Sequence, residues 1–157
     1  MNLSPIAAVL GRLPSGLFVL TARCEDEETG MLASWVMQAG FEPPAITVAL
    51  HKDRVLARWL ATGTPFTVNL LAQEQRPLLA HFARGFEEGE PAFDGLEVER
   101  VSNGTPVLAD TVGYLECEPT GHLDSADHRI FLARVVGGHL NEGRRPLVHV
   151  RKNGMKY

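Results

Sequence analysis

The stretch GMLASWVMQAGFEPPAITVAL, residues 30–50, decides the fold of this chain. Two apolar runs typical of strands, 31–37 and 45–50, flank a short link that ends in Pro43-Pro44. The small residues Ala33-Ser34 inside the first run allow the backbone to come close to a ligand. The two prolines end the first strand and leave two positions of its rim without N–H donors. The stretch therefore predicts two strands joined at the rim of a barrel, which together hold a flat ligand against the barrel.

Length and composition indicate one globular domain covering residues 1–157. A chain of 157 residues can bury a real core, and 45% hydrophobic with 22% charged residues is ordinary for a globular protein. The net charge of −4 gives no reason to expect a nucleic-acid partner. No apolar stretch reaches the roughly 18 residues of a membrane span, and the N-terminus lacks a signal-peptide pattern. We therefore expect a cytoplasmic protein without a membrane partner, in which Cys24 and Cys117 stay reduced.

Turn signals divide the chain into many short strands and three short helices. Ser4-Pro5 is typical of a helix start, with Ile6, Val9, Leu10 and Leu13 on one face. Asp53 is the expected cap of a second helix that ends at Gly63, in which Val55, Leu56, Trp59 and Leu60 share one face. An acidic loop over 25–30 closes a hairpin. Such a pattern predicts a mainly β fold, a Greek-key-like antiparallel barrel with helical insertions. The remaining expected elements are a helix over 73–84 and strands over 17–21, 66–71, 96–101, 106–108, 114–118, 128–136 and 147–150.

Several well-known site patterns are missing from the sequence. It contains no GxGxxG after a strand, no GxxxxGK[ST] and no GxSxG elbow, which argues against Rossmann, P-loop and α/β-hydrolase sites. The group His122, Asp124, Asp127 and His128 lacks an HxH or HxxxH pair, so we expect no metal site.

Two polar segments are candidates for a binding site. Lys52 and Arg54 lie at a predicted helix start, where cations favour a phosphate group; the alternative is a solvated turn with Asp53 as the cap. His128 follows Asp127 at the start of a long strand, hence on a barrel rim, where the carboxylate can orient the imidazole. The alternative for His128 is a surface histidine in a turn.

A family resemblance extends over nearly the whole chain. Its ordered matches include GRLPSGLFVLT at 11–21, MLASWV at 31–36, FEPP at 41–44, KDR at 52–54, VNLL at 68–71, DH at 127–128 and HVRKNG at 149–154. Together these segments resemble the flavin-reductase-like family, the FMN-binding split barrel. Within it they look most like the C-terminal flavin-reductase module of the cyanobacterial flavodiiron proteins. Gly40, where relatives often have serine, and His51, where a small residue is expected, depart from the pattern.

The resemblance implies a dimerising split β-barrel with flavin near the subunit interface. It implies that His128 faces the nicotinamide side of the flavin ring and acts as the catalytic residue. Hydride transfer between two bound rings needs no protein nucleophile, which fits the absence of a triad. The residues that the resemblance assigns to cofactor binding are Leu32, Ala33, Ser34 and Trp35 on the ribityl-phosphate side, Gln38 and Ala39 along the ring, Lys52 and Arg54 at the phosphate, Asn69, Leu70 and Phe86 near the ring, and Arg151 and Tyr157 closing the site.

The expected activity is that of an NAD(P)H:flavin oxidoreductase with FMN or FAD as the flavin and NADH or NADPH as the hydride donor. An alternative is a flavin-binding electron-relay module that a redox partner protein reduces. A third interpretation is a dimeric interaction domain that has lost flavin. The chain is either a free-standing reductase or a module excised from a longer flavodiiron protein.

Overall fold

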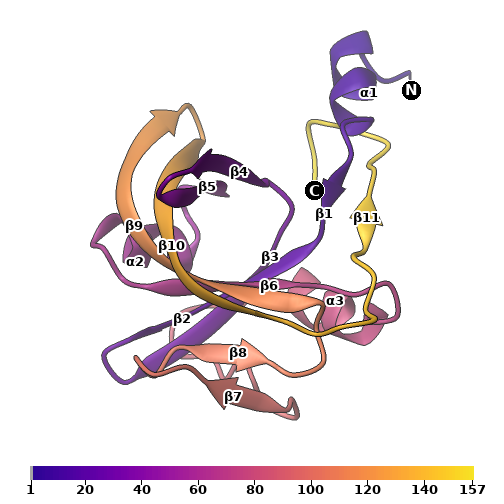
Figure 1. Cartoon of the computed structure of the whole chain (residues 1–157). Coiled ribbons are helices and arrows are strands. Elements are labelled where there is room, and N and C mark those ends of the chain that lie inside the picture. The colour runs from indigo at the N-terminus through magenta and orange to yellow at the C-terminus, as the bar shows by residue number, and fades with distance from the viewer. Residues whose placement is uncertain (1) are drawn as a thin grey trace.

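The computed structural model describes residues 2–157 and consists mainly of antiparallel β-structure (Figure 1). One sheet of seven strands has the order β3-β2-β6-β9-β10-β5-β4. All of its neighbouring pairs are antiparallel, which confirms the predicted fold class. The elements are α1 (Pro5–Gly11), β1 (Ser15–Gly16), β2 (Phe18–Cys24), β3 (Glu27–Ala33), β4 (Val36–Phe41), β5 (Pro44–His51), α2 (Val55–Ala61), β6 (Phe66–Leu70), α3 (Arg76–Ala83), β7 (Val98–Arg100), β8 (Pro106–Leu108), β9 (Gly113–Ser125), β10 (His128–Leu140) and β11 (Val148–His149).

The two strands that follow each other as β3 and β4 lie at opposite edges of this sheet. Only Ser34 and Trp35 connect them, so the sheet must curl until its first and last strands meet at this link. The Trp35 carbonyl accepts a hydrogen bond from the Ala49 amide at 3.0 Å, which ties the link to β5. We call this place the seam. The link joins β3 and β4 here, but the two strands are not hydrogen-bonded neighbours, so the barrel stays split.

The prediction of a single strand over 31–37 is therefore wrong, because the chain passes from one edge of the sheet to the other in the middle of this run. β3 ends at Ala33 and β4 begins at Val36. The hairpin before β3 is also tighter than expected: β2 ends at Cys24 and β3 begins at Glu27, so the turn is confined to Glu25 and Asp26. Strand pairing continues through the acidic residues that the sequence suggested were a loop.

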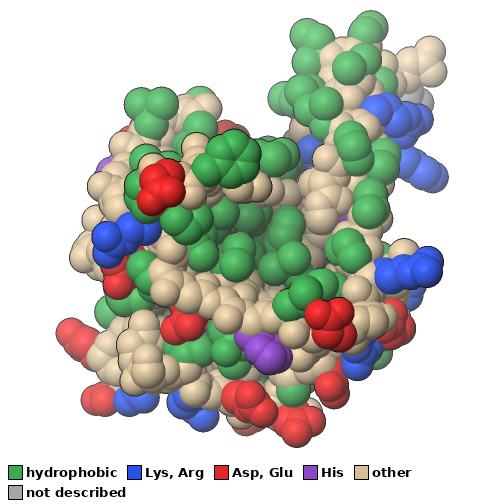
Figure 2. All heavy atoms as spheres, viewed as in Figure 1, with side chains coloured by type: hydrophobic (Ala, Val, Ile, Leu, Met, Phe, Trp, Pro, Cys, Tyr) green, Lys and Arg blue, Asp and Glu red, His purple; other side chains and the backbone are tan. Residues whose placement is uncertain are grey.

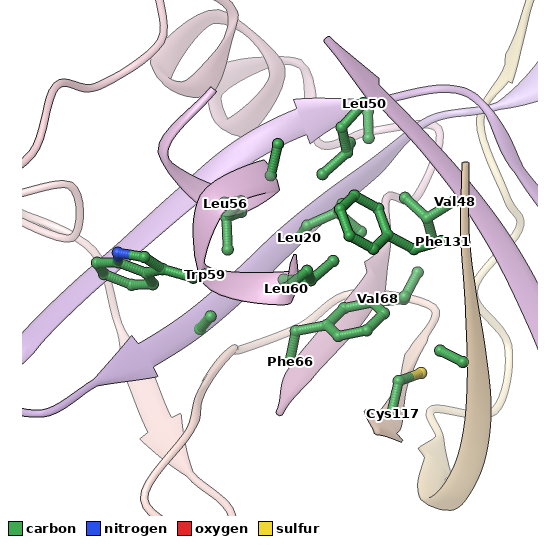
Figure 3. Packing of buried hydrophobic residues seen from close by; sticks show 14 of the residues in the cluster. Leu20, Val48, Leu50, Leu56, Trp59, Leu60, Phe66, Val68, Cys117 and Phe131 are labelled. Atoms are coloured by element: carbon green, nitrogen blue, oxygen red, sulfur yellow. The ribbon is translucent and has the colours of Figure 1, made fainter. Parts of the chain in front are cut away.

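The core lies inside the curled sheet and is closed at one end by α2. Leu56 and Leu60 of α2 pack toward Leu20, Phe66, Val68 and Phe131 of the strands (Figure 3), and Trp59 belongs to the same buried cluster. This confirms the apolar face predicted for the second helix. Its predicted cap is wrong, because Arg54 is the N-cap residue and makes no side-chain capping bond. Asp53 instead donates its backbone N–H to His51 Nδ1 at 3.3 Å.

The first helix and the last residues form an arm that projects from the barrel (Figure 1). Ser4 caps α1 as predicted, its hydroxyl accepting from the Ala7 amide at 3.2 Å. Amides of the C-terminal tail, residues 150–157, bind α1: Arg151 N–H to Gly11 O at 2.8 Å and Gly154 N–H to Ala7 O at 2.7 Å. The apolar face predicted for this helix is real but uncovered, with Ile6 69% and Val9 66% exposed.

Candidate functional site

Three adjoining hollows meet at the seam and share one residue, the C-terminal Tyr157. The second hollow has a volume of about 510 Å³, and small-molecule sites commonly have about 300–1,000 Å³. We call the three together the cleft. The first hollow is lined by Leu32, Ala33, Ser34, Trp35, His51, Arg54, Gly85 and Tyr157 among others, the second by Trp35, His51, Asp127, His128, Arg151 and Tyr157, and the third by Leu17, Leu32, Ala33, Ser34, His149, Arg151 and Tyr157.

Arg54 gives the first hollow its positive charge. Its guanidinium makes no hydrogen bond and no ion pair with any residue in 2–157, although it sits at the start of α2. The neighbouring cation differs: Lys52 Nζ lies 3.4 Å from Asp124 Oδ2 and lines none of the three hollows. Of the two cations predicted for a phosphate group, Arg54 is therefore the one that the fold directs to the cleft.

Gly85 allows Arg54 to reach this position. Gly85 has a φ of +76°, and a Cβ built on it would lie 2.9 Å from Arg54 Nη1. Any larger residue would strain the backbone and push the guanidinium aside. Nothing in the sequence signals the contact of Gly85 with Arg54.

His128 lies in the second hollow with both ring nitrogens engaged. Asp127 Oδ1 lies 2.7 Å from Nδ1, and the Tyr157 hydroxyl lies 2.5 Å from Nε2. An imidazole that donates Nδ1–H to a carboxylate presents Nε2 as an acceptor, so the phenol donates to it. The bond to His128 lowers the pKa of the Asp127 carboxyl, and burial raises the pKa of the Tyr157 phenol. The predicted pairing of Asp127 with His128 is present.

Trp35 supplies a large aromatic wall beside this histidine. Its ring centroid is 4.8 Å from that of His128 and 5.6 Å from that of Tyr157. The Arg151 guanidinium lies 5.4 Å from the same ring, on the C-terminal tail. Arg151 Nη1 also donates to the Lys156 carbonyl at 3.0 Å, which folds the tail back toward the cleft. The end of the chain and the seam thus form one wall.

We expect the substitution Tyr157→Phe to free His128 Nε2. The ring remains against Trp35 while the hydroxyl that occupies the imidazole is lost. Nitrogen chemical shifts of the imidazole should report Nε2 without its partner, and fluorescence of Trp35 should change little. Asp127→Asn is the matched variant on the other ring nitrogen. Identical imidazole shifts in wild type and Tyr157→Phe would contradict this geometry.

Other residues expected to bind a cofactor lie outside the cleft of the single chain. Gln38 and Ala39 are exposed on the edge strand β4, with the Gln38 amide 3.4 Å from the Gly40 carbonyl. Leu70 lines a separate hollow with Tyr114 and His139. Phe86 follows Gly85 and packs on Phe82, with the Arg84 guanidinium 4.3 Å from its ring.

Asn69 is fully buried and has all its bonds within the protein. Its Nδ2 donates to the Val19 carbonyl at 2.9 Å and to Thr21 Oγ1 at 3.0 Å, and its Oδ1 accepts from the Leu108 amide at 2.9 Å. Thr21 and Thr67 share a further hydroxyl contact beside it. This side chain joins β2, β6 and β8 and has no free atom to offer a ligand.

His51 is a cleft residue that the sequence did not assign. It ends β5 directly opposite His128 of β10, and the two ring centroids are 5.3 Å apart. The strand register that brings them together depends on the curl of the whole sheet, which a single sequence does not reveal. The sequence signal that was available is the departure of this position from the family pattern.

Among residues 2–157, no group of three or more His, Cys, Asp or Glu side chains is placed to hold a metal ion. No helix within that range has the length and apolar character that crossing a membrane requires.

Comparison with known proteins places the chain among flavoproteins. The chain is 36% identical over 156 residues to diflavin flavoprotein A 1 of Synechocystis sp. and 39% identical over 150 residues to a diflavin flavoprotein of Thermosynechococcus vestitus. These matches cover 98% and 94% of this chain but 27% and 26% of the relatives. The chain thus spans about a quarter of the length of these curated relatives.

Solved structures show the same fold. The NADH:FAD oxidoreductase SgcE6 of Streptomyces globisporus, in complex with NAD and FAD fragments, has a TM-score of 0.84 and 25% identity, over 96% of this chain and 92% of that one. The flavin reductase PheA2 shares the fold at 22% identity and a TM-score of 0.80, over 92% of this chain and 91% of that one. Residues 10–156 match the family described as flavin reductase like domain, and the chain belongs to that family.

Proposed function

We propose that this protein binds FMN in the cleft and transfers a hydride to it from NADH or NADPH. The observation that carries the proposal is Arg54, a partnerless guanidinium that shares its hollow with the Ser34 hydroxyl and the ring of Trp35. A cation, a hydroxyl and an aromatic wall suit a phosphorylated aromatic nucleotide. The relatives named as diflavin flavoproteins and as an NADH:FAD oxidoreductase support the same chemistry.

Each part of the cleft has a distinct role in this proposal. Arg54 and Ser34 hold the phosphate end, and the backbone of residues 32–35 lies along the cofactor. The bound flavin supplies the hydride acceptor, so the protein has to orient two rings and exclude water. His128, held by Asp127, faces the nicotinamide and orients it. Arg151 and Tyr157 close the cleft on the side of the tail.

The direct test is an absorbance spectrum of the protein with added FMN, recorded before and after anaerobic NADH or NADPH. We expect stoichiometric binding and loss of the flavin absorbance near its visible maximum with at least one nucleotide. FAD in parallel decides between the two flavins. A protein that binds FMN but keeps its colour with both nucleotides is not a reductase.

An electron-relay module is the second candidate, and Tyr157 is the observation that favours it. Because the phenol takes His128 Nε2 and stands beside Trp35, the place for a second ring is partly filled. Flavin that is bound, unbleached by NAD(P)H and reduced by a partner protein would establish the relay.

We further infer that the 157 residues form one domain that pairs with a second copy. The arm leaves a row of large apolar side chains uncovered, and Figure 2 shows hydrophobic groups gathered on it and in the hollow beside it. Exposed apolar patches of this kind commonly mark interaction sites. The row comprises Leu3, Ile6, Val9, Leu13, Val148, Val150 and Met155.

Sedimentation velocity measures this association directly. We expect the wild type to sediment as a dimer and Val9→Glu to shift toward the monomer, because a charge cannot be buried without a partner. Arg12→Glu, also on the arm and already charged, is the matched control that should stay dimeric. A monomeric wild type at tens of micromolar would contradict the inference.

A further inference from the structure

His51 occupies the wall that the first and second hollows have in common. It therefore lies between Arg54, the partnerless cation of the first hollow, and His128 of the second. Its side chain is 36% exposed, so the ring is accessible from the cleft while the backbone is fixed in β5. No other histidine lines both hollows among the described residues.

The hydrogen bonds of His51 decide which nitrogen is available. Nδ1 accepts the Asp53 backbone N–H at 3.3 Å and lies 3.6 Å from Asp53 Oδ2. A neutral imidazole whose Nδ1 accepts carries its proton on Nε2. Nε2 has no hydrogen-bond partner within residues 2–157, so its N–H is available to donate to a ligand in the cleft. On protonation the ring would keep that donor and gain a charge balanced by Asp53.

We propose that His51 is a specificity-determining residue of the cleft, donating Nε2–H to a phosphoryl oxygen of the nucleotide bound at Arg54. This rests on the proposed function and adds a titratable donor to its anion-binding corner. Arg54 supplies a permanent positive charge, whereas the His51 ring donates Nε2–H when neutral and adds a positive charge when protonated. The cleft should therefore bind phosphorylated ligands more tightly when His51 is protonated.

Other ionisable groups surround the His51 ring, and their effects on ligand binding have to be distinguished from the effect of His51. Asp53 pairs with Nδ1, and His128 presents its ring edge-on across the strand pair, with Asp127 behind it. Substituting His51 alone and comparing ligands with and without phosphate isolates its contribution. The charged and titratable groups that face it are Asp53 and Arg54 of its own turn, Asp127 and His128 of the β9–β10 hairpin, and Arg151, Lys156 and Tyr157 of the tail, whereas the adjacent Lys52 is paired with Asp124.

The test compares dissociation constants of wild type, His51→Ala and His51→Gln, measured by flavin fluorescence at pH 6 and pH 8. FMN is compared with riboflavin, which lacks the phosphate, and NADH with a phosphate-free dihydronicotinamide. We expect His51→Ala to weaken FMN binding about tenfold at pH 6 and riboflavin binding not at all. His51→Gln keeps a neutral donor and should lose the part of the pH dependence due to His51. His139→Gln, in the separate hollow beside Tyr114, is the control that should match wild type.

Imidazole resonances provide a readout that is independent of activity. In the wild type, FMN should shift the Nε2 resonance of His51 relative to the riboflavin complex, because only FMN brings a phosphate oxygen to the Nε2–H donor. A loss confined to NADH would assign the phosphoryl group to the nicotinamide nucleotide and support the same donor role. Equal weakening of FMN and riboflavin, or no change in any ligand, would overturn the inference. A wild type that binds no flavin at either pH would instead remove the proposed function, and this inference with it.

Discussion

Replacing Arg54 by alanine should weaken FMN binding by about 10- to 100-fold while leaving riboflavin binding unchanged. A hydrogen bond to a charged group contributes roughly 1.5–3 kcal/mol, and each 1.4 kcal/mol corresponds to about tenfold in affinity. Arg54 has no partner within residues 2–157, so no existing interaction has to be broken when a phosphate binds. Most of the energy of the new hydrogen bond is therefore expressed as affinity. Fluorescence titration of both flavins gives the comparison directly.

Lys52→Ala is the matched control for this prediction. Lys52 is two residues away and carries the same charge, but it is paired with Asp124 and lines none of the cleft. We expect FMN affinity to change less than about threefold, since exposed ion pairs contribute little and screening reduces their range. A larger loss for Lys52→Ala than for Arg54→Ala would place the phosphate on the Lys52 side and contradict the arrangement described above.

The second large effect concerns stability. Asn69→Ala should lower the free energy of unfolding by about 2–4 kcal/mol, because it leaves the Leu108 amide buried without a partner and removes the bonds from Asn69 Nδ2 to Val19 and Thr21. Urea denaturation followed by circular dichroism measures the loss. Flavin affinity of the folded variant should equal that of wild type, since the side chain does not reach the cleft.

Asn103→Ala provides the comparison for Asn69. Asn103 Oδ1 accepts the Thr105 amide at 3.0 Å, but the residue is exposed, so water replaces the lost bond. The expected loss is below about 1 kcal/mol. An Asn69→Ala protein that is as stable as wild type yet binds flavin weakly would show that Asn69 contacts the ligand, as the family resemblance implied.

Much of the fold was predictable from the sequence because local signals agreed with one another. Ser4-Pro5 predicted the start of α1, and the spacing of Val55, Leu56, Trp59 and Leu60 predicted the buried face of α2. The crossing of the seam was not predictable. A continuous apolar run over 31–37 looks the same whether its two halves lie in one strand or at opposite edges of a curled sheet.

The cleft was predictable where residues are adjacent in sequence and unpredictable where distant strands bring them together. Ser34, Trp35, Arg54 and His128 were assigned and line it, whereas Lys52 was assigned with Arg54 and is drawn away by Asp124. Proximity in sequence does not reveal the partner of a side chain. His51 and Gly85 enter the cleft through strand register and backbone conformation, which one sequence cannot supply.

The seam makes ligand binding a property of the whole barrel. Because Ser34 and Trp35 join the two outermost strands of the sheet, the cleft exists only while all seven strands are paired. A ligand held there opposes global unfolding instead of the fraying of one strand. At a concentration 100 times its dissociation constant, it adds about 2.7 kcal/mol to the free energy of unfolding. Occupancy of the cleft would thus be recorded in the slowest-exchanging amides of the barrel, far from the ligand itself.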